Sequence, residues 1–398
     1  MNIDKHIPQG YKDSPLGIIP EEWEVKRLGD CFDISAGRDL LKDKYSPKPS
    51  PTHRYPIYSN SLENKGLYGY TSTPRHKGNC ITITGRGTLG HAEFRNQDFD
   101  AIVRLLVLTP KFDISCWLIA NYINFASPFI YESTGVPQLT APQINNIKIL
   151  LPPYNEQIAI ANVLRLWDTA IEKQSVLIEK LKLRKRALMQ QLLTGKKRLP
   201  GFSGEWKSDK IEDHFKLNDD KNDGKGHIPM TISAKLGFVS QKDKFDRIVA
   251  GNSLDKYTLL KKGDFAYNKG NSNLYEMGCI YLLEEISAVV PFVYICFRAF
   301  DNTCCDFYKH FFINHGLDSQ LNRIITSGAR SDGLLNVNST EFMALRIPYP
   351  SVKEQIAIAN ILNVADKEIE LANEKLANLQ SQKRGLLQHL LTGKKRII

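Results

Sequence analysis

The stretch Glu156-Gln157-Ile158-Ala159-Ile160-Ala161-Asn162 occurs a second time as Glu354-Gln355-Ile356-Ala357-Ile358-Ala359-Asn360. Further along, the stretch LLTGKKR at residues 192–198 recurs at residues 390–396. Each pair of copies lies 198 residues apart, and residues 156–198 and 354–396 are identical at 23 of 43 positions. Self-similarity of this length without a gap indicates that the chain consists of two duplicated halves.

The repeated segment predicts one long helix in each half. Seam residues follow one another in steps of three and four, the a and d positions of a coiled coil. The two seams are Ile160, Leu164, Trp167, Ile171, Gln174, Ile178, Leu181, Leu188 and Leu192, and Ile358, Leu362, Ala365, Ile369, Ala372, Leu376, Leu379, Leu386 and Leu390. Lys185 and Lys383 interrupt the seams at the same heptad, which suggests a polar contact there. Prolines precede each start, and Gly195 and Gly393 follow each last turn, where a helix-ending glycine belongs. Ordinary core helices are the simpler interpretation, but two equal seams favour pairing of the helices with each other.

A globular block precedes each helix, and the two blocks differ. Trp23 and Phe32 correspond to Trp206 and Phe215 at an offset of 183 residues, and little else aligns. Strand-like runs at 79–84, 101–108 and 287–295, with helices around 113–126 and 304–321, predict mixed α/β blocks.

The predicted fold class is therefore α/β (α+β). Two mixed α/β domains are separated by two long, antiparallel, coiled-coil-like helices, and the chain has an internal pseudo-two-fold. The predicted parts are residues 1–154, the first globular domain; 155–198, the first long helix; 199–352, the second globular domain; and 353–398, the second long helix.

Composition narrows the class of protein. The net charge of +10 favours a polyanionic partner, either nucleic acid or an anionic membrane surface. The first residues lack an apolar signal core, and no window reaches the roughly 18 apolar residues of a membrane span, so we expect a cytoplasmic protein without a membrane partner. The seven cysteines lack CxxC spacing, and we expect reduced, mostly buried thiols.

With these features together, the chain resembles the specificity subunit of type I restriction-modification systems over essentially its whole length. The segments that carry the resemblance are GYKDSPLGIIPEEW at 10–23, PPYNEQ at 152–157, QLLTGKKR at 191–198 and GDFAYNK at 263–269. The resemblance implies a non-catalytic subunit that binds double-stranded DNA at a bipartite target. Each globular domain is then a recognition domain for one half-site, and the long helices are spacers. It also implies two modification subunits that carry S-adenosylmethionine for adenine methylation, and two restriction subunits that use ATP and Mg²⁺. No cofactor is expected in this chain.

Two motifs resemble cofactor or catalytic sites. Gly85–Gly90 (GRGTLG) matches the GxGxxG dinucleotide loop after a strand-like run, but residues 91–98 lack the apolar face of the required helix. We instead expect a glycine loop that faces DNA and carries Arg86. The stretch LPPY at 151–154 resembles the (N/D/S)PP(Y/F) site of adenine methyltransferases, but the Leu151 side chain has no hydrogen-bonding group. It is interpreted as the entry into the helix.

Other catalytic signals are weaker still. Glu24-Val25-Lys26 lacks the upstream aspartate of a nuclease, and no GxxxxGK[ST] motif is present. His310 and His315 stand among aromatic and apolar residues, which disfavours metal ligation. We predict no catalytic and no metal site. Two other readings stay open: a self-contained DNA methyltransferase or nuclease with drifted motifs, and a coiled-coil scaffold without a nucleic-acid role.

Recognition chemistry remains. Arg and Lys neutralise phosphates or pair with guanine, and Asn and Gln pair with adenine edges. The predicted DNA-binding residues, chosen from Gly-, Ser- and Asn-rich loops beside strands, are Asn60, Arg75, Lys77, Arg86, Thr134, Gln138, Ser233, Lys235, Tyr267, Asn268, Lys269, Asn271 and Arg330.

Overall fold

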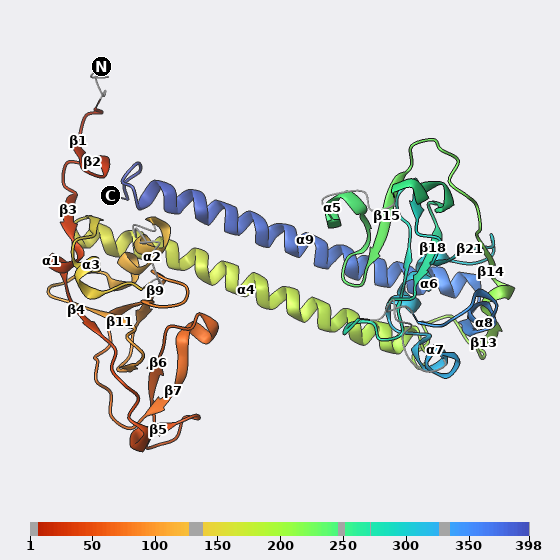
Figure 1. Cartoon of the computed structure of the whole chain (residues 1–398), viewed down its shortest axis with the longest axis horizontal. Helices are drawn as coiled ribbons and strands as arrows, with labels where there is room; N and C mark the ends of the chain where they lie inside the picture. The colour runs from red at the N-terminus through yellow and green to blue at the C-terminus, as the bar shows by residue number, and fades with distance from the viewer. Residues whose placement is uncertain (1–6, 127–137, 246–250, 271, 326–334, 398) are drawn as a thin grey trace. The chain divides into compact units, whose positions relative to one another are not determined.

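The chain forms two compact units in a computed structural model that describes residues 7–126, 138–245, 251–270, 272–325 and 335–397. The first unit consists of Met1–Ser175 and Lys375–Ile398, and the second of Val176–Glu374. Each unit contains one globular block together with part of each long helix (Figure 1).

The two predicted long helices are present. Helix α4 is Tyr154–Leu192 and helix α9 is Val352–Leu390, each of 39 residues. In the first unit, Leu164 near the start of α4 shares a core with Leu390 at the end of α9. In the second unit, Leu192 at the end of α4 shares a core with Ile358 near the start of α9. The helices are therefore antiparallel within each unit, as predicted (Figure 1).

Both helices end as the sequence indicates. Gly195 and Gly393 follow the last turns with φ of +68° and +72°, a left-handed conformation that glycine adopts without a side-chain clash.

The first block is mainly β-structure with short helices. Its strands are β1 (Tyr11–Ser14), β2 (Gly17–Pro20), β3 (Glu24–Arg27), β4 (Phe32–Ala36), β5 (Tyr45–Ser46), β6 (Tyr55–Tyr58), β7 (Leu67–Thr71), β8 (Cys80–Ile83), β9 (Ala92–Arg95), β10 (Asp100–Ala101), β11 (Leu106–Pro110) and β12 (Lys148–Leu151). Its helices are α1 (Leu28–Cys31), α2 (Cys116–Ala126), α3 (Ala141–Asn145) and the 3-10 turns η1 (Lys42–Lys44) and η2 (Glu63–Gly66).

The second block also combines short strands with short helices, in different numbers. Its strands are β13 (Lys207–Lys210), β14 (Phe215–Leu217), β15 (Ile228–Ser233), β16 (Gly237–Ser240), β17 (Thr258–Lys261), β18 (Asp264–Asn268), β19 (Cys279–Leu282), β20 (Ser287–Val290), β21 (Ile295–Ala299) and β22 (Arg346–Tyr349). Its helices are α5 (Gln241–Phe245), α6 (Cys305–Ile313), α7 (Asp318–Ile324), α8 (Ser339–Met343) and the 3-10 turns η3 (Ile211–Asp213) and η4 (Gly251–Lys256).

The sheets of the two blocks follow one plan. An antiparallel sheet has the order β4-β11-β8-β9 in the first block and β14-β21-β18-β19 in the second. A further four-stranded sheet in each block contains one parallel pair, β6–β10 and β15–β20. A two-stranded ribbon, β3–β12 or β13–β22, leads directly into the long helix. The blocks thus share a frame that their sequences no longer reveal.

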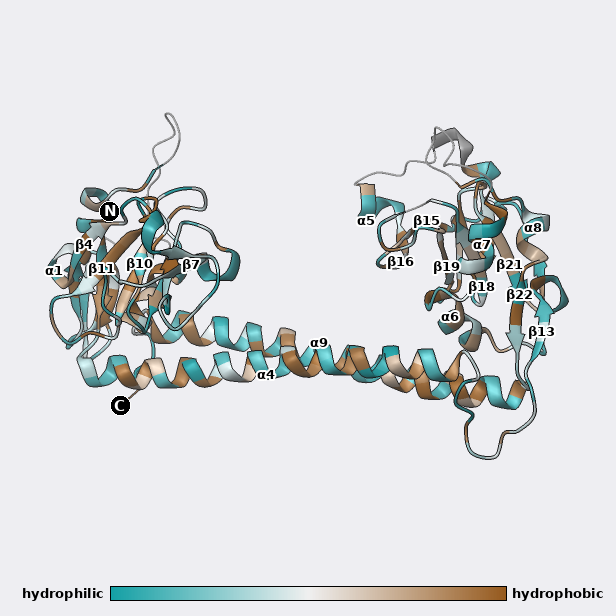
Figure 2. Cartoon of the chain, turned by 90° about the horizontal axis from the view of Figure 1, so that it is seen from below, coloured by the Kyte–Doolittle hydropathy of each residue, from teal (hydrophilic) through white to brown (hydrophobic). Residues whose placement is uncertain are grey.

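The two cores contain residues that the sequence aligned between the blocks. Trp23 and Phe32 are fully buried in the first core, and Phe215 occupies the matching place in the second. Figure 2 shows apolar and polar residues alternating along α4 and α9, as expected of helices with one packed face. Five cysteines are buried, Cys304 and Cys305 are half-buried, and all seven are free thiols.

Three predicted elements are interrupted. The run 101–108 is divided between β10 and β11 by a turn at Ile102–Leu105, in which Val103 and Arg104 have positive φ. The run 287–295 is likewise divided between β20 and β21, the corresponding strands of the second block. The helix predicted around 304–321 is two helices, α6 and α7. Among the described residues, none of the helices is both long and apolar enough to cross a bilayer.

Candidate nucleic-acid interface

A buried glutamate joins each block to the helix pair. In the first unit, Glu156 accepts hydrogen bonds from the Trp23 indole at 3.0 Å and from Arg396 at 2.8 and 3.1 Å. In the second unit, Glu354 accepts from the Trp206 indole at 3.1 Å and from Arg198 at 2.7 Å twice. A buried carboxylate is stable here because a guanidinium pairs with it in each unit.

The neighbouring glutamine repeats the same function. Gln157 accepts from the Ser115 backbone N–H at 2.9 Å and donates to the Pro152 carbonyl at 2.8 Å. Gln355 accepts from the Cys304 backbone N–H and donates to the Pro350 carbonyl, both at 3.0 Å. The sequence repeat Glu-Gln is therefore the duplicated joint between block and helix, a role that sequence analysis did not assign.

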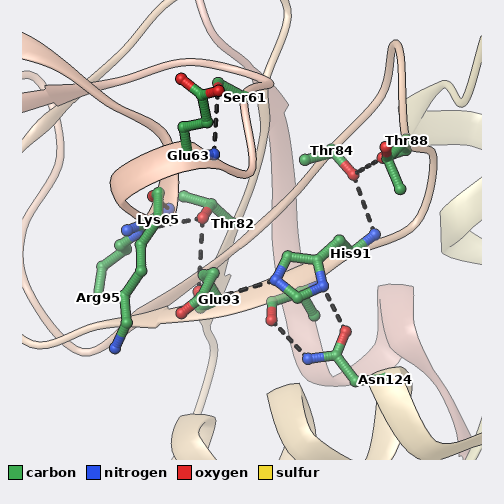
Figure 3. Close-up of polar contacts among 11 residues, drawn as sticks. Ser61, Glu63, Lys65, Thr82, Thr84, Thr88, His91, Glu93, Arg95 and Asn124 are labelled. Atoms are coloured by element: carbon green, nitrogen blue, oxygen red, sulfur yellow. Dashed lines mark hydrogen bonds and ion pairs between the residues drawn. The ribbon is translucent and has the colours of Figure 1, made fainter. Parts of the chain in front are cut away.

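The GxGxxG stretch is part of a hairpin. It connects antiparallel strands β8 and β9, and within it Thr84 Oγ1 accepts from the His91 backbone N–H at 3.0 Å (Figure 3). No helix follows, so the loop lacks the strand–turn–helix context of a dinucleotide site. The LPPY stretch ends strand β12 at the buried Leu151 and enters α4 at Tyr154. The hairpin lacks the helix that a dinucleotide site requires, and the LPPY stretch is the entry into α4, as the sequence predicted.

Three predicted residues of the first block meet beside that hairpin. Asn60 donates to the Val103 carbonyl at 2.7 Å and accepts from the Gly85 N–H at 2.8 Å. Arg86, which is exposed, donates to Gln138 Oε1 at 3.5 Å. The fold thus gathers Asn60, Arg86 and Gln138 at one edge of the block.

The other predictions in the first block have protein partners. Arg75 donates to both carboxylate oxygens of the buried Asp100, at 2.5 and 2.8 Å. Lys77 is largely exposed and lies 3.0 Å from Asp98 Oδ2. Arg75 therefore braces strand β10, whereas Lys77 keeps a solvent-facing ammonium. Thr134 lies outside the described residues.

In the second block, some of the predicted DNA-binding residues lie in the core and others on the surface. Tyr267 has no exposed surface; its hydroxyl donates to the Met277 carbonyl at 2.7 Å, and burial raises its pKa. It therefore cannot reach a base in this conformation. Asn268 donates to the Ile232 carbonyl at 3.3 Å, which places it beside Ser233 at the end of β15. Lys235 is exposed. Asn271 and Arg330 lie outside the described residues.

Lys269 lines a cavity of about 400 Å³ together with Asp219, Phe292, Tyr294 and Asn338. Its carbonyl accepts from the Leu335 N–H at 2.9 Å, just as the Gly85 carbonyl accepts from the Leu139 N–H at 3.0 Å. The loop after the central strand is therefore fastened to the segment before α8 or α3 by the same bond in both blocks. By this bond Lys269 corresponds to Gly85, and Arg86 lies one position further along the loop.

A second polar group was not foreseen from the sequence. Arg95, almost fully buried, donates to Thr82 Oγ1 at 2.9 Å and to the Lys65 carbonyl at 2.8 Å (Figure 3). Burial lowers the pKa of its guanidinium. Arg95 and Glu93 border a cavity of about 540 Å³ beside Trp117 of α2. Arg95 thus holds the β8–β9 hairpin against the turn before β7.

The two histidines considered for metal binding are engaged elsewhere. His310 is fully buried and its Nε2 lies 2.8 Å from Asn363 Oδ1, while His315 Nδ1 lies 2.8 Å from Asp318 Oδ2. Within the described ranges, no three His, Cys, Asp or Glu side chains are grouped as metal ligands would be.

Comparisons with known proteins agree with this organisation. A family model described as the type I restriction modification DNA specificity domain matches residues 20–183. The chain is 21% identical to the putative type I restriction enzyme MjaX specificity subunit of Methanocaldococcus jannaschii, over 98% of this chain and 97% of that protein. It is 22% identical to the MjaVIII specificity subunit of the same organism, over 98% of both. The crystal structure of the type I restriction-modification S subunit from M. genitalium superposes with a TM-score of 0.59 at 15% identity, covering 93% of this chain and 96% of that one.

Proposed function

Because the chain belongs to the family of type I restriction-modification specificity subunits, we propose that it reads a bipartite DNA target, one half-site for each block. It recognises DNA and is a non-catalytic subunit, as the family is. The observation that carries the bipartite reading is the duplicated joint: Glu156 and Glu354 attach two divergent blocks to matching parts of the helix pair. A shared frame with different exposed side chains is what two readers of different sequences require.

The proposed modules keep the bounds expected from the sequence: recognition domains at 1–154 and 199–352, and spacer helices at 155–198 and 353–398. The proposed DNA-facing residues are Asn60, Lys77, Arg86, Thr134, Gln138, Ser233, Lys235, Asn268, Lys269, Asn271 and Arg330. Arg75 and Tyr267 are left out, since one is ion-paired to a buried carboxylate and the other is fully buried. The net charge of +10 suits a double-stranded DNA partner.

We further propose that two modification subunits dock on the helix pair. Ile158 and Leu166 on α4 are exposed, and Ile356 and Val364 stand exposed at the matching positions of α9. Exposed apolar side chains on an otherwise polar helix face are typical of a protein interface. Two copies of one face fit two copies of one partner. Those subunits would hold S-adenosylmethionine, and two restriction subunits would use ATP and Mg²⁺, all in the cytoplasm.

The experiment is a block exchange followed by mapping of methylated adenines. Residues 24–150 are replaced with the first block of another family member, and host DNA is sequenced for methylation. One half-site of the target should change while the other half-site and the gap persist. A change in both half-sites would refute separate reading by the two blocks. The same assay without the exchange defines the native target, and methylation by this chain alone would refute the non-catalytic assignment.

A further inference from the structure

The turn Ile102–Leu105 between β10 and β11 has an unusual backbone. Val103 and Arg104, neither of them glycine, have φ of +54° and +59°. A β-branched residue rarely adopts the left-handed region, because its Cβ substituents crowd the backbone. Such conformations persist only where surrounding contacts enforce them, and they concentrate at functional surfaces.

The contacts that enforce this turn come from three other segments. The Val103 and Arg104 N–H groups donate to the carbonyls of Arg38 and Gly37, at 3.2 and 3.1 Å. The Val103 carbonyl accepts from the Asn60 amide at 2.7 Å. A Cβ on Gly85 would lie 3.2 Å from the Arg104 carbonyl and 2.9 Å from that of Leu139, so only glycine allows the hairpin to approach this closely. The turn is therefore a fixed part of the block.

The turn exposes one apolar side chain close to several arginines. Val103 is 50% exposed, and Arg38, Arg86 and Arg104 are exposed around it. Within the described residues, none of these three guanidinium groups takes part in an ion pair. A solvated surface gains nothing from a strained, exposed valine. A DNA major groove offers a partner for each group, since thymine presents a methyl group and guanine two acceptors.

The second block has a turn at the same point of the fold. The Tyr294 N–H donates to the Pro291 carbonyl at 3.0 Å, as the Leu105 N–H donates to the Ile102 carbonyl at 3.1 Å. There the tip carries Phe292, which is 57% exposed and borders the Lys269 cavity. One position of the frame thus presents different side chains in the two blocks, as a specificity determinant must.

We infer that the Val103–Arg104 turn reads bases of the first half-site, with Arg104 donating to a guanine edge and Val103 contacting a neighbouring base through its methyl groups. This inference rests on the proposed function and adds to it the residues that set the first half-site. Arg104 then discriminates among bases, whereas Arg38 and Arg86 border the same surface.

The test is selection from a random duplex library by the full chain assembled with its modification subunits. Arg104→Gln should lose preference at one base pair of the first half-site by about 5- to 150-fold, with the second half-site unchanged. Arg54→Gln is the matched control, because Arg54 is an exposed arginine at the far end of β6 from Asn60. Val103→Gly should weaken one base preference without lowering the melting temperature, since glycine accepts the positive φ. Val103→Asn, which tolerates that region, serves as a second variant.

The possible results distinguish a failure of the inference about Val103 and Arg104 from a failure of the proposed function. Weaker binding to all sequences alike would make Arg104 a phosphate contact and overturn the inference, and so would an unchanged preference in both the Arg104 and Val103 variants. If the wild-type assembly selects no sequence at all, the proposed function itself fails. Loss of preference in Arg54→Gln equal to that in Arg104→Gln would also overturn the assignment.

Discussion

Lys383 Nζ on helix α9 lies 2.5 Å from Asp168 Oδ1 on helix α4. In the second unit, Lys185 on α4 pairs in the same way with Asp366 on α9. Both lysines are mostly buried, while both aspartates are more than 40% exposed. The two lysines that interrupt the predicted seams therefore form matching ion pairs across the helix pair, which fixes which residues face one another.

Removing one partner of this pair should destabilise the first unit only modestly. Asp168→Ala leaves the Lys383 ammonium without its partner, and we expect a loss of about 1 kcal/mol in the free energy of unfolding, because Asp168 is screened by water. Urea unfolding followed by tryptophan fluorescence measures this loss. In the double variant Asp168→Ala/Lys383→Leu, leucine completes the apolar seam and stability should return. A double variant no more stable than the single one would contradict this account.

The duplicated joint offers a pair of matched substitutions. Glu156→Ala leaves the Trp23 indole and the Arg396 guanidinium without their buried acceptor, and the free energy of unfolding of the first unit should fall by about 3–5 kcal/mol. Glu354→Ala should do the same to the second unit. Hydrogen–deuterium exchange with peptide resolution assigns the loss to one unit, and each variant is the control for the other. Equal deprotection of both units by either variant would show that the joints are not independent.

The second unit should lose stability in mild acid through His310. Burial lowers the pKa of His310, with the nearby cations Lys185 and Lys309 acting in the same direction, whereas Asn363 and Asp366 oppose the shift. The folded state therefore binds fewer protons than the unfolded state. The neutral His310 side chain therefore contributes fully to the stability of the folded state above the unfolded pKa of about 6.5. This contribution declines as the pH falls below that value.

The variant His310→Asn should remove part of this dependence. Asparagine occupies the corresponding place in the first block at Asn121, six residues after the backbone N–H that Gln157 accepts from. Protection factors of α6 peptides, which correct the exchange rates for their intrinsic dependence on pH, should fall between pH 7.5 and 5.5 in the wild type and fall less in the variant. An equal pH effect in both proteins would exclude His310 as its source.

The helix length should set the unread gap of the target. Inserting one heptad at matching places in α4 and α9 keeps both seams in phase and lengthens each helix by about 10 Å. At 3.4 Å per base pair, the gap should grow by about two to four pairs while both half-sites persist. Methylation mapping reads the gap directly. Recovery of the original gap would show that the helices do not determine it.

The helices could be predicted because a repeated seam depends only on the local spacing of apolar side chains. Their starts lie within one residue of the predicted 155 and 353, whereas they end at Leu192 and Leu390, before the predicted 198 and 398. The seam starting at Ile160 and ending at Leu192 lies within α4, Tyr154–Leu192. Contacts between distant segments could not be read in this way. The run 101–108 has the composition of one strand, and it is broken because Asn60 and the carbonyls of Gly37 and Arg38 bind the turn from elsewhere.

The candidate site could be predicted only in part, because local composition identifies polar loop residues but does not show which of them the fold buries. Arg86 and Gln138 were chosen as polar loop residues, and the fold brings them together. Tyr267 was chosen from a loop-like segment, yet it belongs to the central strand β18, where helix-side packing against Phe342 covers it. A single sequence does not show which side of a strand faces a covering layer, so burial at Tyr267 was hidden.

The first unit is built from both ends of the chain, whereas the second is continuous. Leu390 and Leu391 complete the core around Trp23, and the Tyr11 hydroxyl donates to the Gly393 carbonyl at 3.0 Å. During synthesis on the ribosome, residues 375–398 emerge only after all of Val176–Glu374 has been made. The block translated first is therefore the one finished last, and its open apolar core has to remain protected from aggregation or chaperone capture while the second block folds.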